Sequence, residues 1–270
     1  MPRRSVRRRL DTELVRRRLL DSRARAAQEI RAGRVLVGGA PATSPARQVS
    51  ADEAIRCLGP SPRYVSRGGE KLAAALRRFA VEASGLRALD AGASTGGFTD
   101  CLLQHGAAEV AAVDVGHGQL AWRLRTDPRV RVLERTNVRT LEPDDLGGPV
   151  ALAVADLSFI SLRTVAAAIL RCTTNDATML LLVKPQFEAG KPRVGKGGII
   201  RDPAVRADVL VEVVEGLAGL GLGTVDAMSS PLRGAGGNVE YMIAARNDAA
   251  CMSTAALRAT VLADVEPESR

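Results

Sequence analysis

Residues 86–98 read LRALDAGASTGGF, an apolar run that ends in Asp90 and then breaks into a glycine-rich turn. A short buried strand that leads into such a turn, and then into a helix, is typical of a nucleotide-cofactor site in an α/β fold. Gly92, Gly96 and Gly97 have no Cβ, so the backbone at these positions can pass close to a ligand. An ordinary strand-to-helix turn is the alternative interpretation.

The polar residues of this turn favour one class of cofactor. Asp90 and the hydroxyls of Ser94 and Thr95 suit a cationic, hydrogen-bonding ligand better than a pyrophosphate, and S-adenosylmethionine is the commonest such cofactor. The next predicted strand, 109–114, ends in Asp114, an acid placed to bind ribose hydroxyls. The predicted cofactor site comprises Asp90, Gly92, Ser94, Gly96, Gly97, Phe98, Asp114 and Asn137. Either Asn137 or Val138 is expected near the adenine, and Asn137 can as easily be a turn residue.

Length and composition restrict the class of protein. The chain has 270 residues, enough for one sizeable α/β core and a small module. Its longest apolar runs are far shorter than the roughly 18 residues that a membrane-spanning helix needs. The four cysteines show no CxxC spacing, and neither histidine lies near a cysteine pair. We therefore expect a cytoplasmic, monomeric protein with reduced thiols, no metal and no membrane partner.

Positive charge is concentrated in the first sixty residues. They contain 14 arginines, no lysine and six acids, a net of +8, which equals the net charge of the whole chain. An acidic polymer is therefore the expected partner of this segment. A solvated tail would explain residues 1–9, but not the basic residues that continue through two helical patterns.

The pattern of this basic segment is helix, helix, strand. Asp11 begins the first helix, Ser22 is placed to cap a second one, and Gly33 is placed to end it. The order LDTEL, SRARAAQEI, GRVLVGG resembles the small RNA-binding domain named after ribosomal protein S-four. From this resemblance and the charge pattern, RNA contacts are expected at Arg7, Arg16, Arg18, Arg23, Arg25, Arg34 and, beyond the module, Arg67.

A proline-rich stretch, GPSPRYV, separates the basic segment from the rest of the chain. We place the RNA-binding domain at 1–59, with a basic tail at 1–9, a linker at 60–65 and a second domain at 66–270. Strands and helices then alternate, as a doubly wound parallel sheet requires. The predicted fold is α/β, with a Rossmann-like sheet of seven strands near 86–90, 109–114, 130–133, 150–155, 178–183, 223–228 and 239–245.

Lysine is rare in this chain, which has four lysines against 34 arginines. Because lysine can give up a proton and arginine stays charged, a retained lysine indicates a specific role. Lys184 and Asp156 each end a predicted strand and are expected at the carboxyl edge of the sheet, where ligands bind in this architecture. Each candidate alone can be a surface residue or a cap. Together, Lys71, Asp156, Lys184 and Glu240 form the predicted catalytic set.

This Lys-Asp-Lys-Glu set and the DAGASTGGF turn resemble those of the FtsJ-like 2′-O-ribose methyltransferases. With the amino-terminal module, nearly the whole chain is similar to the TlyA family of two-domain rRNA methyltransferases, once catalogued as haemolysins. The resemblance implies S-adenosylmethionine-dependent methylation of cytidine in 16S or 23S rRNA, with an effect on sensitivity to ribosome-directed cyclic peptide antibiotics. The alternatives are a non-catalytic ribosome-binding or assembly factor and a haemolysin-type membrane-active protein.

Methyl transfer is an in-line displacement, so the site must align a ribose hydroxyl behind the methyl group. We predict that Lys184 orients this hydroxyl and accepts its proton, and that Asp156 and Glu240 hold Lys184. Lys71 is expected to steady the ribose or a phosphate. The resting protonation state stays open, because two lysines and two acids sum to zero charge.

Three further features have no single assigned role, and two of them have two interpretations each. The basic, glycine-rich segment 188–198 is either a mobile lid over RNA or an ordinary surface loop. Phe159 and Phe187 follow the two catalytic strand ends and either sandwich a flipped base or pack in the core. Tyr64 lies in the predicted linker, where it could couple RNA binding to cofactor binding.

Overall fold

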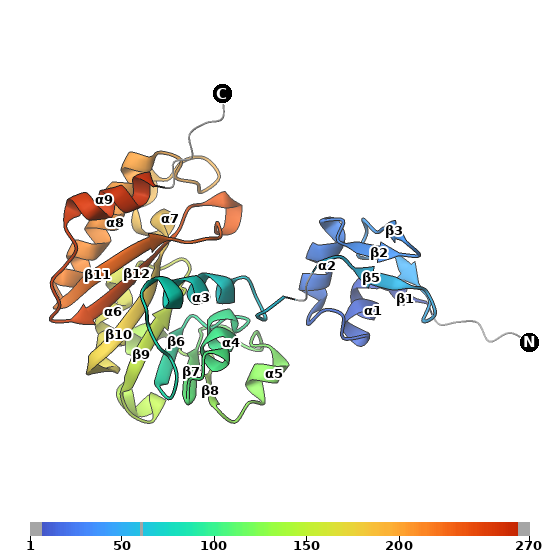
Figure 1. Ribbon diagram of the computed structural model, residues 1–270, viewed down its shortest axis with the longest axis horizontal. Coiled ribbons are helices and arrows are strands. Elements are labelled where there is room, and N and C mark those ends of the chain that lie inside the picture. The colour runs from blue at the N-terminus through green and yellow to red at the C-terminus, as the bar shows by residue number, and fades with distance from the viewer. Residues whose placement is uncertain (1–6, 60–61, 264–270) are drawn as a thin grey trace, which may run out of the picture. The chain divides into compact units, whose positions relative to one another are not determined.

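The computed structural model of the chain describes residues 7–59 and 62–263. Within these ranges the chain forms two compact units, which divide between Pro62 and Arg63 (Figure 1). The division falls inside the predicted linker, 60–65. Residues 60–61 of that linker and residues 1–6 of the predicted basic tail lie outside the described ranges.

The first unit packs two helices against short strands. Ser22 caps the second helix as predicted, because its side chain accepts a hydrogen bond from the backbone N–H of Arg25 at 3.2 Å, and Gly33 follows that helix with φ 69°. The prediction of a tail is wrong at β1 (Arg8–Arg9), which pairs with β4 (Gln48–Val49). The remaining elements are α1 (Leu10–Arg16), α2 (Arg23–Arg31), β2 (Val35–Val37), β3 (Ala40–Pro41) and β5 (Ile55–Cys57).

The second unit contains a seven-stranded sheet with the order β11-β12-β10-β9-β6-β7-β8, and all seven predicted strands are present. The prediction of a wholly parallel sheet is wrong at one strand, because β12 runs antiparallel to both of its neighbours. A strand that follows its neighbour through a short connection must return antiparallel, whereas a parallel return needs a long crossover. The strands are β6 (Arg87–Ala91), β7 (Glu109–Val113), β8 (Val130–Leu133), β9 (Val150–Ala155), β10 (Thr173–Val183), β11 (Leu222–Ser229) and β12 (Tyr241–Asn247).

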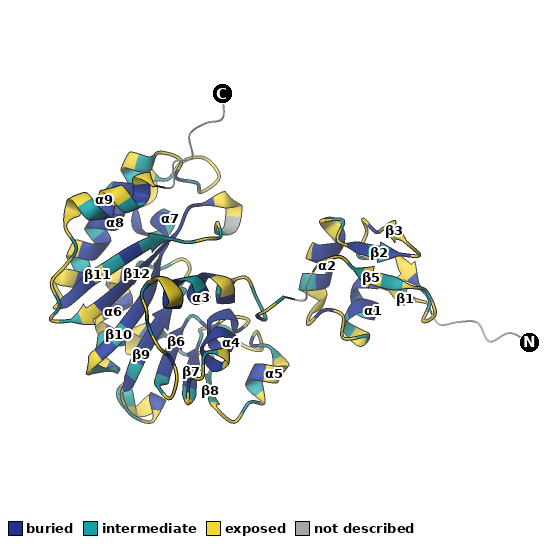
Figure 2. Cartoon of the chain, in the orientation of Figure 1, coloured by how far each residue is buried: buried dark blue, intermediate teal, exposed yellow. Residues whose placement is uncertain are grey.

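Helices cover both faces of this sheet, so the strands are mostly buried (Figure 2). One core cluster joins the sheet to α3 (Gly68–Arg78) and α4 (Gly97–Gln104), and the other joins it to α6 (Leu162–Arg171), α8 (Pro203–Ala218) and α9 (Thr254–Leu262). An acid caps the start of α8: the Asp202 side chain accepts a hydrogen bond from the N–H of Ala204 at 2.8 Å. The shorter helical segments are α5 (Trp122–Arg125), α7 (Pro185–Glu188), η1 (Val138–Thr140), η2 (Pro143–Leu146), η3 (Lys191–Arg193) and η4 (Ala235–Gly237).

The strand order reverses between β6 and β9, since β7 and β8 extend the sheet on one side of β6 while β9 and β10 extend it on the other. In an open α/β sheet, a ligand crevice forms outside the carboxyl ends of the strands at this switch point. The backbone N–H of Asp156 donates to the carbonyl of Ala91 at 3.1 Å, which joins the two strand ends there. Among the described residues, the structure holds no helix that is long and apolar enough to cross a membrane.

Tyr64 lies in the core of the second unit, so its assignment to the linker is wrong. It is 1% exposed and belongs to the core cluster that includes Leu72 and Phe98. Its ring packs directly against Gly69, where any Cβ would overlap the tyrosine side chain. The small residue in α3 leaves the space that an aromatic ring fills, and sequence spacing alone did not show this.

Truncation of Tyr64 is therefore expected to destabilise the second unit. Tyr64→Ala should lower the free energy of unfolding by about 3–5 kcal/mol, the cost of removing a buried aromatic side chain, in denaturant titrations followed by circular dichroism. Arg63→Ala is the control, because Arg63 is exposed and its guanidinium only stacks on the Tyr64 ring, at 5.0 Å. An equal decrease in the free energy of unfolding in both variants would contradict the burial of Tyr64 and favour a linker position.

Candidate active site

The glycine-rich turn after β6 has the geometry that its sequence indicated. Gly92 has φ 90°, and a Cβ there would lie 2.7 Å from the carbonyl oxygen of Asp156, so a larger residue would push the two strand ends apart. Ser94 also has a positive φ, 48°, and its backbone N–H donates to Asp114 Oδ2 at 2.8 Å. The predicted turn is thus a tight connection that joins β6, β7 and β9.

Asp90 lies beneath this turn and lines neither of the two cavities described below. Its side chain is fully buried, and its Oδ2 accepts a hydrogen bond from Thr99 Oγ1 at 2.6 Å. Burial raises the pKa of Asp90 from the ordinary 3.8 to about 7. Gly96 is also turned away from the cavities, toward Leu120 and Leu124. These two predicted cofactor residues therefore hold the shape of the turn.

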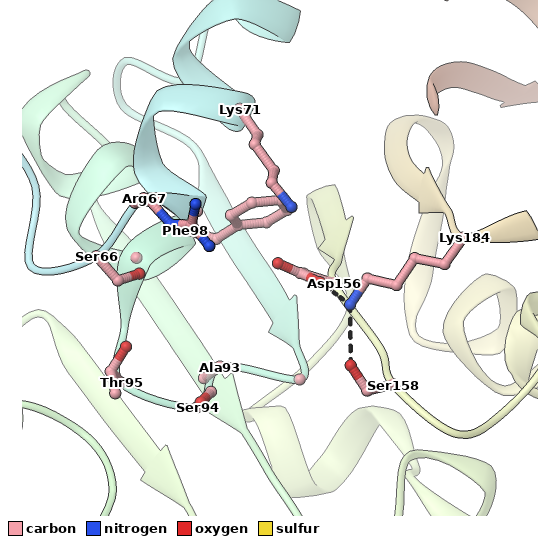
Figure 3. A pocket seen from close by; sticks show the side chains of 13 residues that line it. Ser66, Arg67, Lys71, Ala93, Ser94, Thr95, Phe98, Asp156, Ser158 and Lys184 are labelled. Atoms are coloured by element: carbon pink, nitrogen blue, oxygen red, sulfur yellow. Dashed lines mark hydrogen bonds and ion pairs between the residues drawn. The ribbon is translucent and has the colours of Figure 1, made fainter. Parts of the chain in front are cut away.

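Two cavities open at the carboxyl edge of the sheet and share Gly92, Ser94, Asp156 and Ser158. The first, the lysine cavity, has a volume of about 280 Å³ and is drawn in Figure 3. The second, the Asp114 cavity, has a volume of about 460 Å³. The other residues around the lysine cavity are Ser66, Arg67, Gly68, Lys71, Ala93, Thr95, Gly97, Phe98 and Lys184; those around the Asp114 cavity are Asp114, Val115, Gly116, Gln119, Val138, Leu157 and Phe159.

Lys184 follows β10 and is held by two groups at the end of β9. Its Nζ lies 2.5 Å from Asp156 Oδ1 and donates to Ser158 Oγ at 2.9 Å (Figure 3). The lysine is 8% exposed, so its ammonium depends on these partners rather than on bulk water. Asp156 was predicted as a partner of Lys184. Ser158 was missed, although its position two residues after Asp156 was a signal.

Glu240 pairs with Lys71 Nζ, and the prediction that it holds Lys184 is wrong. The antiparallel register that pairs Val183 with Tyr241 does bring Glu240 beside Lys184 along the backbone. However, α3 covers this face of the sheet and places Lys71 over Glu240, which is 2% exposed. The four predicted catalytic residues therefore form two ion pairs, Lys71–Glu240 and Lys184–Asp156.

Aromatic residues lie differently around the two cavities. Phe98 is buried and lines the lysine cavity, whereas Phe159 is 90% exposed beside the Asp114 cavity. The prediction that Phe159 packs in the core is wrong: its ring contacts that of Phe187, with centroids 5.0 Å apart, and its φ is 64°. A bulky residue held in the left-handed region is strained, and such strain often marks a functional position.

The remaining predicted residues divide between the two units. Asn137 lies outside the residues that line the cavities and caps η1, since its Oδ1 accepts from the N–H of Arg139 at 3.1 Å; the next residue, Val138, does line the Asp114 cavity. Arg67 lines the lysine cavity. The ion pairs of the predicted RNA-binding arginines in the first unit are Arg7–Glu53, Arg16–Glu13, Arg23–Asp11, Arg25–Glu29 and Arg34–Glu29.

The segment 188–198 is anchored to the second unit at two points. The buried Glu188 carboxylate accepts hydrogen bonds from Ser161 Oγ at 2.5 Å and from the N–H of Leu162 at 2.7 Å. Arg193 Nη1 lies 2.5 Å from Glu212 Oε1 on α8. These contacts fix the first half of the segment, and its function as a lid stays a prediction.

Comparison with known proteins gives the class and then the family. The FtsJ-like methyltransferase family matches residues 64–247, and the S4 domain matches residues 8–55. The chain thus joins an FtsJ-like methyltransferase domain to an S4 domain. The 16S/23S rRNA (cytidine-2′-O)-methyltransferase TlyA of Mycobacterium tuberculosis is 54% identical over 236 residues, which cover 87% of this chain and 88% of that protein. The chain therefore belongs to the TlyA family of methyltransferases.

Two further relatives agree with this assignment. The proposed rRNA methyltransferase YqxC of Bacillus subtilis is 44% identical over 88% of this chain and 85% of that protein. The solved structure of a proposed hemolysin from Streptococcus thermophilus superimposes with a TM-score of 0.78, at 35% identity, over 95% of both chains. The similarity therefore extends over both the S4 domain and the methyltransferase domain.

The raised pKa of Asp90 predicts a pH dependence of stability. The folded state keeps this carboxyl protonated up to about pH 7, whereas the unfolded chain ionises near 3.8. The stability it contributes is therefore present below pH 4 and lost as the pH rises toward 7, at up to about 1.4 kcal/mol per pH unit. Asp90→Asn keeps a hydrogen-bond acceptor for Thr99 and removes the titration.

Denaturant titrations of the wild type and of Asp90→Asn between pH 4 and 8 test this expectation. The free energy of unfolding of the wild type should fall relative to that of the variant up to about pH 7 and then run parallel to it. A difference that stays constant over the whole range would show that Asp90 is ionised in the folded protein.

Proposed function

We propose that this protein transfers a methyl group from S-adenosylmethionine to the 2′-hydroxyl of a cytidine in 16S or 23S ribosomal RNA. One observation carries the proposal: Lys184, in the lysine cavity, contacts Asp156 and Ser158, and these two residues line both the lysine cavity and the Asp114 cavity. A group held by these shared residues can act on a hydroxyl that enters from one cavity and a methyl donor that occupies the other. The nature of the RNA is supported by the activity of the relative from Mycobacterium tuberculosis.

The Asp114 cavity fits the adenosine part of this cofactor. The two oxygens of Asp114 accept backbone hydrogen bonds from Ser94 and Gly116, at 2.8 and 2.7 Å, and each oxygen keeps a second lone pair for a ribose hydroxyl. Val138 and Leu157 provide apolar surface for a base. When bound, S-adenosylmethionine supplies an electrophilic methyl group. Gly92 keeps the wall between the cavities thin enough for two reactants to approach.

Lys184 is suited to hold the ribose hydroxyl and to take its proton. Once its ammonium has released a proton to solvent, the neutral amine can donate to both Asp156 and Ser158 and still turn its lone pair toward a third group. The proton of the hydroxyl then moves to Nζ as the oxygen is methylated. The resulting ammonium keeps the same two contacts, so no rearrangement is needed during the reaction.

The remaining cations of the lysine cavity fit the phosphodiester chain next to the target ribose. Lys71 is neutralised by Glu240, so it offers hydrogen-bond donors at little net charge. Arg67, which is exposed at the start of α3, adds a permanent charge. These groups orient the ribose, and orientation is the main requirement of an in-line displacement.

Phe159 offers an exposed ring at the edge of the Asp114 cavity. A base lifted out of its stack needs such a surface, and the strained backbone holds this ring in place without core packing. We include Phe159 as the residue on which the target base stacks.

The test of the function is methyl transfer from labelled S-adenosylmethionine to separated ribosomal subunits, with 2′-O-methylcytidine mapped through nuclease-resistant dinucleotides. Lys184→Ala should lower kcat by about 10²–10⁴-fold, the usual contribution of a general base, and leave cofactor and RNA binding nearly intact. Ser158→Ala should cost less, about 10-fold, because Asp156 still holds the lysine but its orientation is lost. Arg246→Ala is the control, because Arg246 lies far from the carboxyl edge and pairs in register with Thr178.

Two outcomes would contradict this proposal. Absence of transfer to either subunit, with the cofactor bound, would favour a non-catalytic ribosome-binding factor. Loss of RNA or cofactor binding in Lys184→Ala would assign that lysine to binding. The proposed effect on cyclic peptide antibiotics requires that a strain lacking this activity changes its sensitivity and recovers it with the wild type, but not with Lys184→Ala.

Replacement of Phe159 separates base stacking from chemistry. Phe159→Ala should raise KM for the ribosomal substrate by about 10-fold or more, since stacking of one base on an aromatic ring is worth about 1–3 kcal/mol. Because Phe159 also lines the edge of the Asp114 cavity, the Kd for S-adenosylmethionine should change as well, but far less than this KM. Phe159→Tyr keeps the ring and should retain the wild-type KM. A KM in the tyrosine variant as high as in the alanine variant would contradict stacking.

A further inference from the structure

We propose that the S4 domain holds a binding site for a single unstacked nucleotide of the RNA substrate, in a cavity rimmed by arginines. The proposal rests on the proposed function insofar as RNA is the polymer that supplies the nucleotide. The cavity has a volume of about 530 Å³, and every residue around it belongs to the first unit. That volume lies in the usual range of small-ligand sites, about 300–1,000 Å³. The residues that carry the argument are Arg18, Leu19, Arg25, Arg34, Arg56 and Leu58.

The charge of this cavity favours an anionic ligand. Four arginines line it against one acid, Glu29, which is 8% exposed. Arg25 Nε lies 2.9 Å from Glu29 Oε1, and Arg34 Nε lies 2.5 Å from Oε2. The guanidinium of Arg34 holds the pKa of Glu29 below its ordinary value. A single buried carboxylate thus fixes two guanidinium planes and leaves an excess of positive charge at the rim.

The end of α1 requires a positive φ at Arg18, which an arginine adopts only with strain. Arg18 has φ 57° and follows α1 in a Schellman arrangement, in which its N–H donates to Val15 at 2.9 Å and the N–H of Leu19 donates to Leu14 at 3.0 Å. Glycine adopts this conformation without strain, and arginine does not. An arginine kept here at a cost in stability, with its side chain at the cavity, points to a binding role.

The walls of the cavity favour a base over a phosphate alone. Leu19 and Leu58 are 39% and 41% exposed, large fractions for leucine side chains beside a positively charged rim. The first aromatic residue of the chain is Tyr64, so the S4 domain has no aromatic ring on which a base can stack. Guanidinium planes and aliphatic side chains can take that place, because unstacked bases pack on both. An RNA duplex would present its phosphates to the cavity, and its stacked bases would not contact the apolar walls.

Cys57 lines the same cavity and provides a local reporter, while the exposed Cys251 lies in the other unit. Burial raises the pKa of the Cys57 thiol, so alkylation by N-ethylmaleimide is followed at mildly alkaline pH, peptide by peptide, by mass spectrometry. The full-length protein is used without a methyl donor. The probes are a short single-stranded RNA of mixed sequence and an abasic ribose-phosphate chain of equal length.

Intact RNA at about ten times its Kd should slow the alkylation of Cys57 by about tenfold, in proportion to occupancy, and leave Cys251 unchanged. The abasic chain should protect Cys57 far less. Arg18→Gly should weaken this protection while it raises the thermal stability of the protein, because it relieves the positive φ. Arg31→Ala removes one charge from an exposed position of α2 outside the cavity and should keep the protection.

Equal protection by intact and abasic chains would overturn the proposal, as would bound RNA that leaves the Cys57 rate unchanged. Equal loss of Cys57 protection in Arg18→Gly and Arg31→Ala would show that protection depends on net charge alone. This result would also overturn the proposal. None of these outcomes depends on methyl transfer. Failure of the proposed catalytic function would instead appear in the subunit assay, with Cys57 protection intact.

Discussion

Two ion pairs, Lys184 with Asp156 and Lys71 with Glu240, place four charges at the carboxyl edge of an apolar sheet. A buried charge without a partner is strongly destabilising, so each of these residues requires the element that carries the other. The four come from α3, the ends of β9 and β10, and the residue before β12. The strand order therefore also determines these two ion pairs. A different order would leave an ammonium or a carboxylate buried without its partner.

The glycine-rich turn after β6 also depends on the strand order, because it packs against the end of β9. Gly92 must lack a side chain because the end of β9 lies against it, and Asp90 must be buried because it holds α4 through Thr99. The turn consequently divides the crevice into two cavities that share a wall at Asp156 and Ser158. Two adjoining cavities would hold the two molecules of the proposed reaction close together, and proximity supplies much of the rate.

Local signals in the sequence were enough to predict the seven strands and the cap at Ser22, and they selected the four residues that the fold brings together as two ion pairs. Signals of this kind report periodicity and residue type, and they contain no information on which side chains meet. The predicted partner of Glu240 was therefore wrong. Strand register alone favours Lys184, and only the position of α3 brings Lys71 to Glu240. The exposure of Phe159 and the burial of Tyr64 depend on neighbours in the same way.

Arginine in the S4 domain and lysine in the methyltransferase domain are suited to different tasks. Three buried acids of the S4 domain each hold two arginines: Asp11 with Arg9 and Arg23, Glu13 with Arg16 and Arg17, and Glu29 with Arg25 and Arg34. Guanidinium groups fixed in this way lose less conformational entropy when they bind phosphate or a base. Arginine stays charged, which suits the capture of a polyanion, whereas proton transfer requires a group that can change its charge. The buried acids of the S4 domain therefore order arginines, and Asp156 and Glu240 of the methyltransferase domain hold the two lysines of the predicted catalytic set.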